Sequence, residues 1–226
     1  MHSLTEENYL KGLYQLADES GAVSVNELSR HLGIKMPTVN SMVKKLSEKK
    51  LVHYESYKPL RLTEKGKKAA ALIIRKHRLT EMFLVEKMGF GWESVHEIAE
   101  QMEHIKAPEF FEKMDELLGH PQFDPHGSPI PDSKGRMPVI HNIRLSECKA
   151  GDKVKLVTVT DSSPEFLKYL NARELSLGTI LAIISVEPFD GSMQVEFGTK
   201  RREHLSRQVC DMLLVQKEPK SLSGKR

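Results

Sequence analysis

The stretch HEIAEQMEH, residues 96–104, gathers imidazole and carboxylate side chains that could bind a metal ion. At about 3.6 residues per turn, His96, Glu100, Glu103 and His104 fall along one stripe of a helix. Imidazole and carboxylate groups at this spacing suit a divalent first-row cation. The alternative interpretation is a solvated polar stripe on a surface helix, and the rest of the chain must decide between them.

Neighbouring helices are needed to hold such a site. The apolar pattern predicts a long helix over 64–90, which carries His77 and Glu81 one turn apart on the same face. The stretch itself is expected to form a helix from about Ser94 to Ile105, and a third helix from Pro108 to Gly119. The aromatic residues of this region exceed what a small domain can bury, which suggests a homodimer face.

The N-terminal third has the pattern of a helix-turn-helix. A first helix capped by Ser3 or Thr5 is followed by a capping box of Ser24 and Glu27, and that second helix stops at Gly33. A third helix begins near Pro37 and presents small or basic residues outward. The predicted DNA-contacting residues here are Lys35, Pro37, Thr38, Asn40, Ser41, Lys44 and Lys45.

Residues 51–66 predict a β-wing after this third helix, with strands over 51–54 and 60–62 and Lys58 at the turn. Residues 1–80 hold 15 basic and 8 acidic residues, against 19 and 23 in the remainder, although the whole chain carries only +3. This asymmetry favours a polyanionic partner for the N-terminal third, and a winged helix that binds double-stranded DNA is expected.

After this helical region the pattern changes to a loop and then short strands. Residues 121–142 are rich in Pro and Gly and predict a linker. Short β runs over 143–217, interrupted by a helix capped at Ser163, predict a small barrel of about five strands, with one pair joined through Asp190–Gly191. The polar end of the chain, 218–226, is expected to be disordered.

Composition excludes several other classes of protein. With 39% hydrophobic and 29% charged residues the chain is expected to be soluble and globular. It shows neither an apolar run long enough for a membrane span nor a secretion leader, and Cys148 and Cys210 form no metal-binding pair, so a cytoplasmic location is expected. An enzyme is not expected, because His96 to Glu100 fails the HExxH motif and Glu93-x-x-His96 supplies only one of the two pairs of a di-iron site.

Several stretches together resemble the diphtheria toxin repressor and manganese transport regulator family of metal-dependent repressors. The resemblance covers residues 4–170. The matching stretches are TEENYLKGLYQL, IKMPTVNSMVKKLSEKKLV, LRLTEKG, IRKHRLTEMFL, VHEIAEQMEH and FDPHGSPIP. The resemblance implies a mainly α-helical chain with α+β elements. Its expected parts are a winged helix-turn-helix (1–64), a helical metal-binding and dimerisation domain (65–120), the linker (121–142) and a C-terminal SH3-like domain (143–217).

The resemblance also implies where metal binds. A regulatory site would use Asn8, Glu100, Glu103 and His104. Manganese-type members have an acid at the position of Asn8, so Glu7 is the alternative ligand there. Lys11 also replaces an acid of that type, which removes a possible ligand of a second metal.

A second site would use His77, Glu81 and His96. Residues matching further ligands of some manganese-type members are Asp124, His126 and Asp161, for which ordinary turn residues are the alternative interpretation. The expected cofactor is Mn²⁺, with Fe²⁺ as the alternative, at two ions per chain, because Glu100 makes the regulatory site rich in oxygen.

The sequence therefore predicts a repressor that binds operator DNA as a homodimer when loaded with metal and controls genes of metal homeostasis. No small organic substrate and no membrane partner are expected. A winged-helix regulator that acts without metal remains the rival interpretation.

Overall fold

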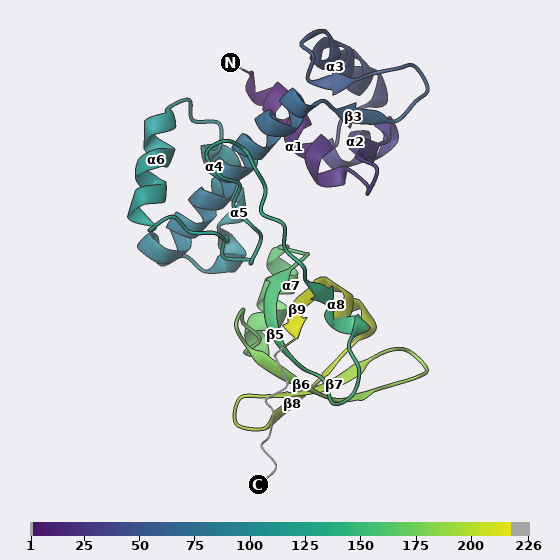
Figure 1. The fold of residues 1–226 in the computed structure, drawn as a ribbon, viewed down its shortest axis with the longest axis vertical. Coiled ribbons are helices and arrows are strands. Elements are labelled where there is room, and N and C mark those ends of the chain that lie inside the picture. Colours follow the sequence, from purple (N-terminus) through teal and green to yellow (C-terminus); the bar gives the residue numbers. More distant parts are fainter. Residues whose placement is uncertain (1, 218–226) are drawn as a thin grey trace. The chain divides into compact units, whose positions relative to one another are not determined.

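A computed structural model describes residues 2–217, which form two compact units (Figure 1). The first unit contains the chain up to residue 88 together with 97–122 and 129–138, and the second contains 89–96, 123–128 and 139 onward. Segments of the predicted linker thus belong to both units. The predicted disordered tail, 218–226, lies outside the described residues.

The first unit begins with a three-helix head and a small sheet. Its elements are α1 Leu4–Leu16, β1 Ala22–Val23, α2 Val25–Leu32, α3 Met36–Glu48, β2 Val52–His53 and β3 Leu60–Leu62. The predicted signals act as expected: Ser3 and Ser24 each form a capping box, and Gly33 ends α2 in the left-handed region. Pro37 lies in the first turn of α3.

The wing is a three-stranded antiparallel sheet in the order β1-β3-β2. Val52 pairs with Leu62 and Val23 pairs with Leu60, so alternate side chains of β3 face the helices. These strands share one apolar core with the helices, whose fully buried members include Leu10, Leu28, Val39, Val43 and Leu46. The sheet therefore fixes the wing beside α3, and the predicted winged helix-turn-helix is confirmed.

A long helix continues from the head into a second, smaller core. The elements are α4 Glu64–Met88, α5 His96–Met102 and α6 Pro108–Leu117. Thr63 caps α4 through the N–H of Gly66, and the small core includes Leu79 of α4 and Phe111 of α6.

The expected bounds of these helices were too long. Residues 92–94 form a separate 3-10 turn before α5, Glu103 and His104 follow its end, and α4 and α6 stop before Gly89 and Gly119, whose φ angles are positive.

The second unit is a small antiparallel sheet with two short helices. Its elements are η1 Trp92–Ser94, β4 Ile143–Arg144, η2 Leu145–Glu147, β5 Lys153–Val159, α7 Pro164–Ala172, β6 Ile180–Val186, β7 Met193–Phe197, β8 Arg201–Leu205, α8 Arg207–Met212 and β9 Leu213–Lys217. The strand order is β4-β9-β5-β6-β7-β8, around a separate apolar core. The SH3-like domain is confirmed, and Asp190–Gly191 joins β6 to β7 as predicted.

Two details of the second unit differ from the sequence interpretation. Residues 207–212 are helical and not one of the expected short β runs, because Ser206 caps α8. The strand β8 was not identified from the sequence, because four of its five residues are arginine, glutamate or histidine and only Leu205 is buried. Within residues 2–217, no helix combines the length and the apolar character that crossing a membrane requires.

Candidate metal centre and nucleic-acid interface

The helix α1 has ionisable side chains on its buried face. Glu7 and Lys11 of α1 are buried, and Asn8 is half-buried between them. Charged side chains are rarely buried unless they are paired. The partners of these residues therefore identify a site.

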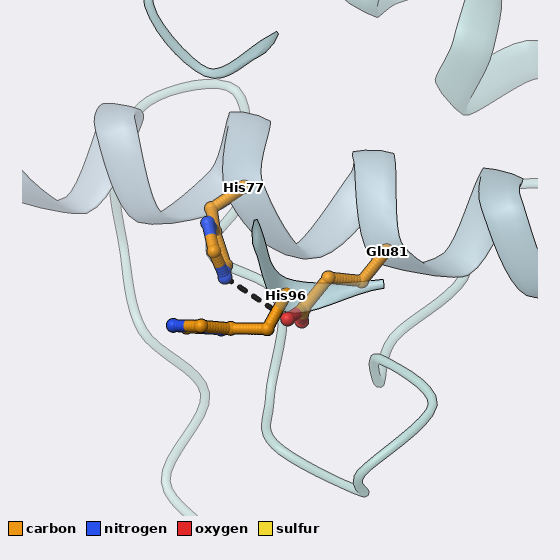
Figure 2. A group of neighbouring side chains, drawn as sticks. All are labelled: His77, Glu81 and His96. Atoms are coloured by element: carbon orange, nitrogen blue, oxygen red, sulfur yellow. Dashed lines mark hydrogen bonds and ion pairs between the residues drawn. The ribbon is translucent and has the colours of Figure 1, made fainter. Parts of the chain in front are cut away.

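The middle of α4 contributes an imidazole and a carboxylate. His77 Nε2 lies 3.0 Å from Glu81 Oε1, one turn further along the helix, and both side chains are buried (Figure 2). The other ring nitrogen, His77 Nδ1, lies 2.6 Å from Glu103 Oε2. Figure 2 also draws His96, which begins α5 and belongs to the second unit.

These carboxylates keep His77 protonated at neutral pH when no metal is bound. Burial by itself lowers the pKa of this imidazole, but the hydrogen bonds to Glu103 and Glu81 outweigh burial and raise the pKa of His77 to about 9. A metal ion binds only an unprotonated ring nitrogen. Metal binding at His77 therefore requires the loss of a proton.

The end of α5 supplies the remaining first-unit candidates. Glu100 lies in the last turn of α5, and the N–H of Glu103 still donates to the carbonyl of Ala99 over 2.9 Å. This hydrogen bond continues the helical backbone by one residue beyond α5. Glu103 and His104 there contact Lys11 and Glu7 of α1. Glu103 is completely buried.

Lys11 lies at the centre of this group of residues. Its Nζ is 2.6 Å from Glu100 Oε1 and 2.7 Å from Glu103 Oε2. It is also 3.2 Å from His77 Nδ1. One ligand atom from each of His77, Glu100 and Glu103 lies within 4.8 Å of the other two, a spacing that suits a cation. The sequence interpretation treated Lys11 only as a lost ligand and did not foresee this contact.

A second set of donors lies beside the lysine. Glu7 Oε2 is 2.6 Å from His104 Nδ1, and His104 Nε2 is 3.7 Å from Glu103 Oε1. Asn8 Oδ1 and Glu103 Oε1 are buried and have no hydrogen-bond partner among the described residues. A buried oxygen without a partner costs about 1–3 kcal/mol. The residues present therefore fit a divalent cation, which would satisfy both oxygens.

The remaining predicted ligands, Asp124, His126 and Asp161, lie in the second unit. Asp124 Oδ1 accepts hydrogen bonds from the backbone N–H groups of His126 and Ser128. His126 Nε2 lies 2.9 Å from the carbonyl oxygen of Trp92. Asp161 Oδ1 accepts a hydrogen bond from the backbone N–H of Ser163 at the start of α7. The contacts of Asp124 and Asp161 are those of turn residues, whereas His126 bonds to a residue 34 positions away in the chain. A metal-binding role for these three residues stays a prediction.

The predicted DNA-contacting residues occupy one face of α3 and the wing. The exposed members are Lys35, Pro37, Thr38, Ser41, Lys44, Lys45 and Lys58, and Asn40 is half-buried. A hollow between α3 and the wing is lined by Asn40, Lys44 and Lys58 among others. Tyr57, which sequence reasoning did not single out, is fully exposed beside Lys58. Its position in a polar turn was the available signal.

An ion pair connects α1 to the C-terminal end of α3. Glu6 Oε1 is 2.6 Å from Lys49 Nζ and 3.6 Å from Lys45 Nζ. The hydrogen bond from Lys49 lowers the pKa of the Glu6 carboxyl below its usual value. Sequence reasoning missed this link, because residues 6 and 49 are distant in the chain and each is ordinary on its helix.

Comparisons with known proteins agree with this architecture. The family model described as "Iron dependent repressor, N-terminal DNA binding domain" matches residues 1–60. The model "Iron dependent repressor, metal binding and dimerisation domain" matches residues 63–132, and the FeoA domain model matches residues 143–217.

Individual relatives give the same result. The iron-dependent repressor IdeR of Mycobacterium tuberculosis (strain ATCC 25618 / H37Rv) is 32% identical over 160 residues, which cover 68% of this chain and 70% of IdeR. A solved manganese-dependent transcriptional repressor in complex with manganese is 30% identical, with a TM-score of 0.86 over 94% of this chain and 99% of that one. The structure of ScaR with bound Zn²⁺ is 31% identical, with a TM-score of 0.77 over the same shares of the two chains.

The fold, the site and these matches define a metal-dependent DNA-binding regulator. The chain belongs to the family of metal-dependent transcriptional repressors that includes the iron-dependent and diphtheria toxin repressors. Members of this family are transcriptional repressors rather than enzymes.

Proposed function

We propose that this chain binds operator DNA as a homodimer when a divalent ion joins α1 to the end of α5, and that it represses genes of metal uptake and homeostasis. The observation that supports this most directly is that two buried oxygens, Asn8 Oδ1 and Glu103 Oε1, have no hydrogen-bond partner in the described part of the chain. Glu103 Oε1 lies 3.7 Å from His104 Nε2, and His104 pairs with Glu7, the neighbour of Asn8 in α1. Glu100 completes the proposed ligand set from α5.

We propose Mn²⁺ as the physiological ion, with Fe²⁺ as the alternative. The candidate ligands on α1 and α5 offer carboxylate, amide and imidazole groups, a hard donor set that favours these ions over softer ones. The two cysteines, Cys148 and Cys210, are buried in the apolar core of the second unit, where burial raises the pKa of both thiols.

A second ion per chain remains part of the proposal. His77 and Glu81 would hold it from α4, as the resemblance implies. The further ligands proposed for it on the same ground are His96, Asp124, His126 and Asp161.

The proposed coupling to DNA passes through α1. When bound, a divalent ion supplies positive charge shared by oxygens of α1 and α5. Glu7 and Asn8 lie on the side of α1 that faces this site, while Glu6 pairs with Lys49 of α3. A change in the position of α1 therefore reaches the DNA-reading helix directly. The resulting shift can be no larger than the difference in metal affinity between the two conformations.

The proposed dimer explains exposed apolar side chains on the helical region. Phe110 and Leu117 lie two turns apart on α6 and are exposed, while Phe111 and Met114 on the adjoining face are buried. Met88 at the end of α4 is exposed as well. A second copy covering these residues would place two α3 helices for half-sites about 34 Å apart.

The test is a titration of the full chain with Mn²⁺ and, separately, Fe²⁺ under anaerobic conditions. Binding to a fluorescent fragment of its own promoter is followed by anisotropy, with a chelator as the reference. We expect binding that depends on metal and saturates at two ions per chain. Equal DNA binding with chelator and with metal would mean a winged-helix regulator that acts without metal.

A further inference from the structure

Lys11 places a positive charge inside the proposed metal centre. Its side chain is 6% exposed, and the ammonium lies within 3.2 Å of three residues, each of which offers a metal-ligating atom. Two of those residues, Glu100 and Glu103, are also proposed ligands of the regulatory ion. The ammonium and that ion would therefore share the same carboxylates.

Each of the two oxygens of Glu103 is available to a different cation, one to the lysine and the other to the proposed ion. Oε2 accepts the hydrogen bond from Lys11 and lies against His77, whereas Oε1 has no hydrogen-bond partner among the described residues. Oε1 is the oxygen nearer to His104, at 3.7 Å from its Nε2. One oxygen of the carboxylate thus binds the lysine, and the other lies on the side of His104, which itself pairs with Glu7.

From this geometry we propose that Lys11 is a built-in cation that fills one of two adjacent cation positions between α1, α4 and α5. The neighbouring position, whose proposed ligands are Asn8 (or Glu7), Glu100, Glu103 and His104, then takes a single divalent ion. Lys11 is a positioning residue, because it holds Glu100 and Glu103 without touching DNA. This inference rests on the proposed function, since it concerns the same metal centre.

The lysine also ties the helices when no metal is bound. Its backbone belongs to α1 and its ammonium is bonded to Glu100 on α5 and to Glu103 just beyond it, so the α1–α5 contact is already closed on that side. A buried charge is retained only when it is paired in this way. Metal then acts on the remaining side, where Asn8 Oδ1 and Glu103 Oε1 have no hydrogen-bond partner within residues 2–217.

The decisive experiment replaces Lys11 and counts metal ions. In Lys11→Glu the ammonium becomes a carboxylate among Glu100, Glu103 and His77, which creates a second ion position. Calorimetry with Mn²⁺ should then find one more ion per chain than in the unchanged protein. The electron paramagnetic resonance spectrum should show two exchange-coupled Mn²⁺ ions. The control is Lys113→Glu, which makes the same charge change on the exposed surface of α6 and should leave the number of ions unchanged.

A second variant decides the matter if Lys11→Glu does not fold. Lys11→Met removes the charge while keeping an unbranched side chain, so Mn²⁺ at the neighbouring position should bind about tenfold more tightly or better, because a repelling charge is gone. A folded Lys11→Glu with an unchanged ion count and no coupled spectrum would overturn the inference, as would unchanged or weaker Mn²⁺ affinity in Lys11→Met. These outcomes differ from failure of the proposed function, in which the unchanged protein itself shows no metal-dependent DNA binding.

Discussion

Glu6 Oε1 accepts a 2.6 Å hydrogen bond from Lys49 Nζ, and this pair joins the metal-facing helix α1 to the C-terminal end of α3. The next residue, Glu7, pairs with His104 beyond α5. Adjacent side chains of one helical turn thus reach the DNA-reading helix and the proposed metal centre.

Glu6→Gln should separate metal binding from DNA binding. The amide keeps the size of the side chain but loses the charge, so Mn²⁺ affinity should be unchanged while metal-dependent DNA affinity falls several-fold. The loss of stability should be about 1 kcal/mol, since Lys49 remains partly exposed. Because the folded pKa of Glu6 is lowered, the stability it contributes is present above the unfolded pKa of about 4.5 and is lost as the pH falls through the folded pKa.

Calorimetry and anisotropy on the same samples measure the two affinities, and urea unfolding from pH 3 to 7 measures the stability. Glu64→Gln, at the exposed start of α4, is the matched control. If Glu6→Gln lowered both affinities equally, α1 would not transmit the effect through Lys49.

Metal binding should release a proton from His77. Its pKa of about 9 means that the imidazole is protonated at pH 7, so Mn²⁺ affinity at this residue should rise about tenfold per pH unit up to about 9 and then level off. Calorimetry in buffers of different ionisation enthalpy measures the release, and zero protons released at pH 7 would contradict the assigned protonation.

The stability of the metal-free protein should depend on pH in the opposite direction, falling as the pH rises. A raised pKa stabilises the fold fully below the unfolded value of 6.5, and this contribution disappears as the pH rises through about 9. Urea midpoints of the chelated protein between pH 6 and pH 10 should therefore decrease.

His104→Gln should abolish the metal response. The variant removes the imidazole that lies between Glu7 and Glu103, and the affinity for Mn²⁺ should fall by about 100-fold or more, because a direct ligand is lost. The fold and the dimer should persist, as checked by size-exclusion chromatography. The control is His120→Gln, whose exposed imidazole pairs with Asp115 at a distance from the site, and a normal metal response in His104→Gln would remove His104 from the ligand set.

Lys44→Ala should weaken DNA binding without changing its sequence preference. This exposed lysine of α3 lines the hollow beside the wing, where a phosphate contact is expected. The slope of log affinity against log salt should decrease in magnitude by about 0.9 on operator and on unrelated DNA alike. Loss of affinity for the operator alone would instead indicate that Lys44 contacts a base.

Gly66→Ala should destabilise the first unit, against the usual preference of helices for alanine. A Cβ at this position would collide with the carbonyl oxygen of Leu51 at the start of the wing. We expect a loss of about 2–3 kcal/mol, typical of overpacking, as measured by thermal unfolding. Ala69→Gly on the same helix is the comparison, with an expected loss of about 1 kcal/mol from helix propensity together with a small loss of packing against the core of the head.

Local signals in the sequence were sufficient for the helices of the head and for the wing, while the metal-binding roles of the site residues stay predictions. Capping boxes at Ser3 and Ser24, and Pro37 at the start of α3, act within a few residues, so their effects can be read from the chain. The spacing of His96 and Glu100 also follows from the helix alone, whereas Glu103 and His104 follow the end of α5.

What the sequence could not supply were the pairings between distant residues. The contact of Lys11 with Glu100 and Glu103 joins segments about ninety residues apart. A lysine at that position in α1 has the same local pattern whether it is solvated or buried. Its role depends on how the helices pack, which periodicity does not specify.

The helix α4 takes part in two separate cores, with Ala70 and Ile73 buried in the head and Leu79 buried against α6. Its 25 residues form one continuous helix about 37 Å long. This helix connects the DNA-reading head to the helices that are proposed to meet a second copy. One residue inserted between the two cores would turn the head by about 100°. The number of residues in this helix therefore sets the rotational orientation of the head relative to the DNA groove, independently of the metal ligands.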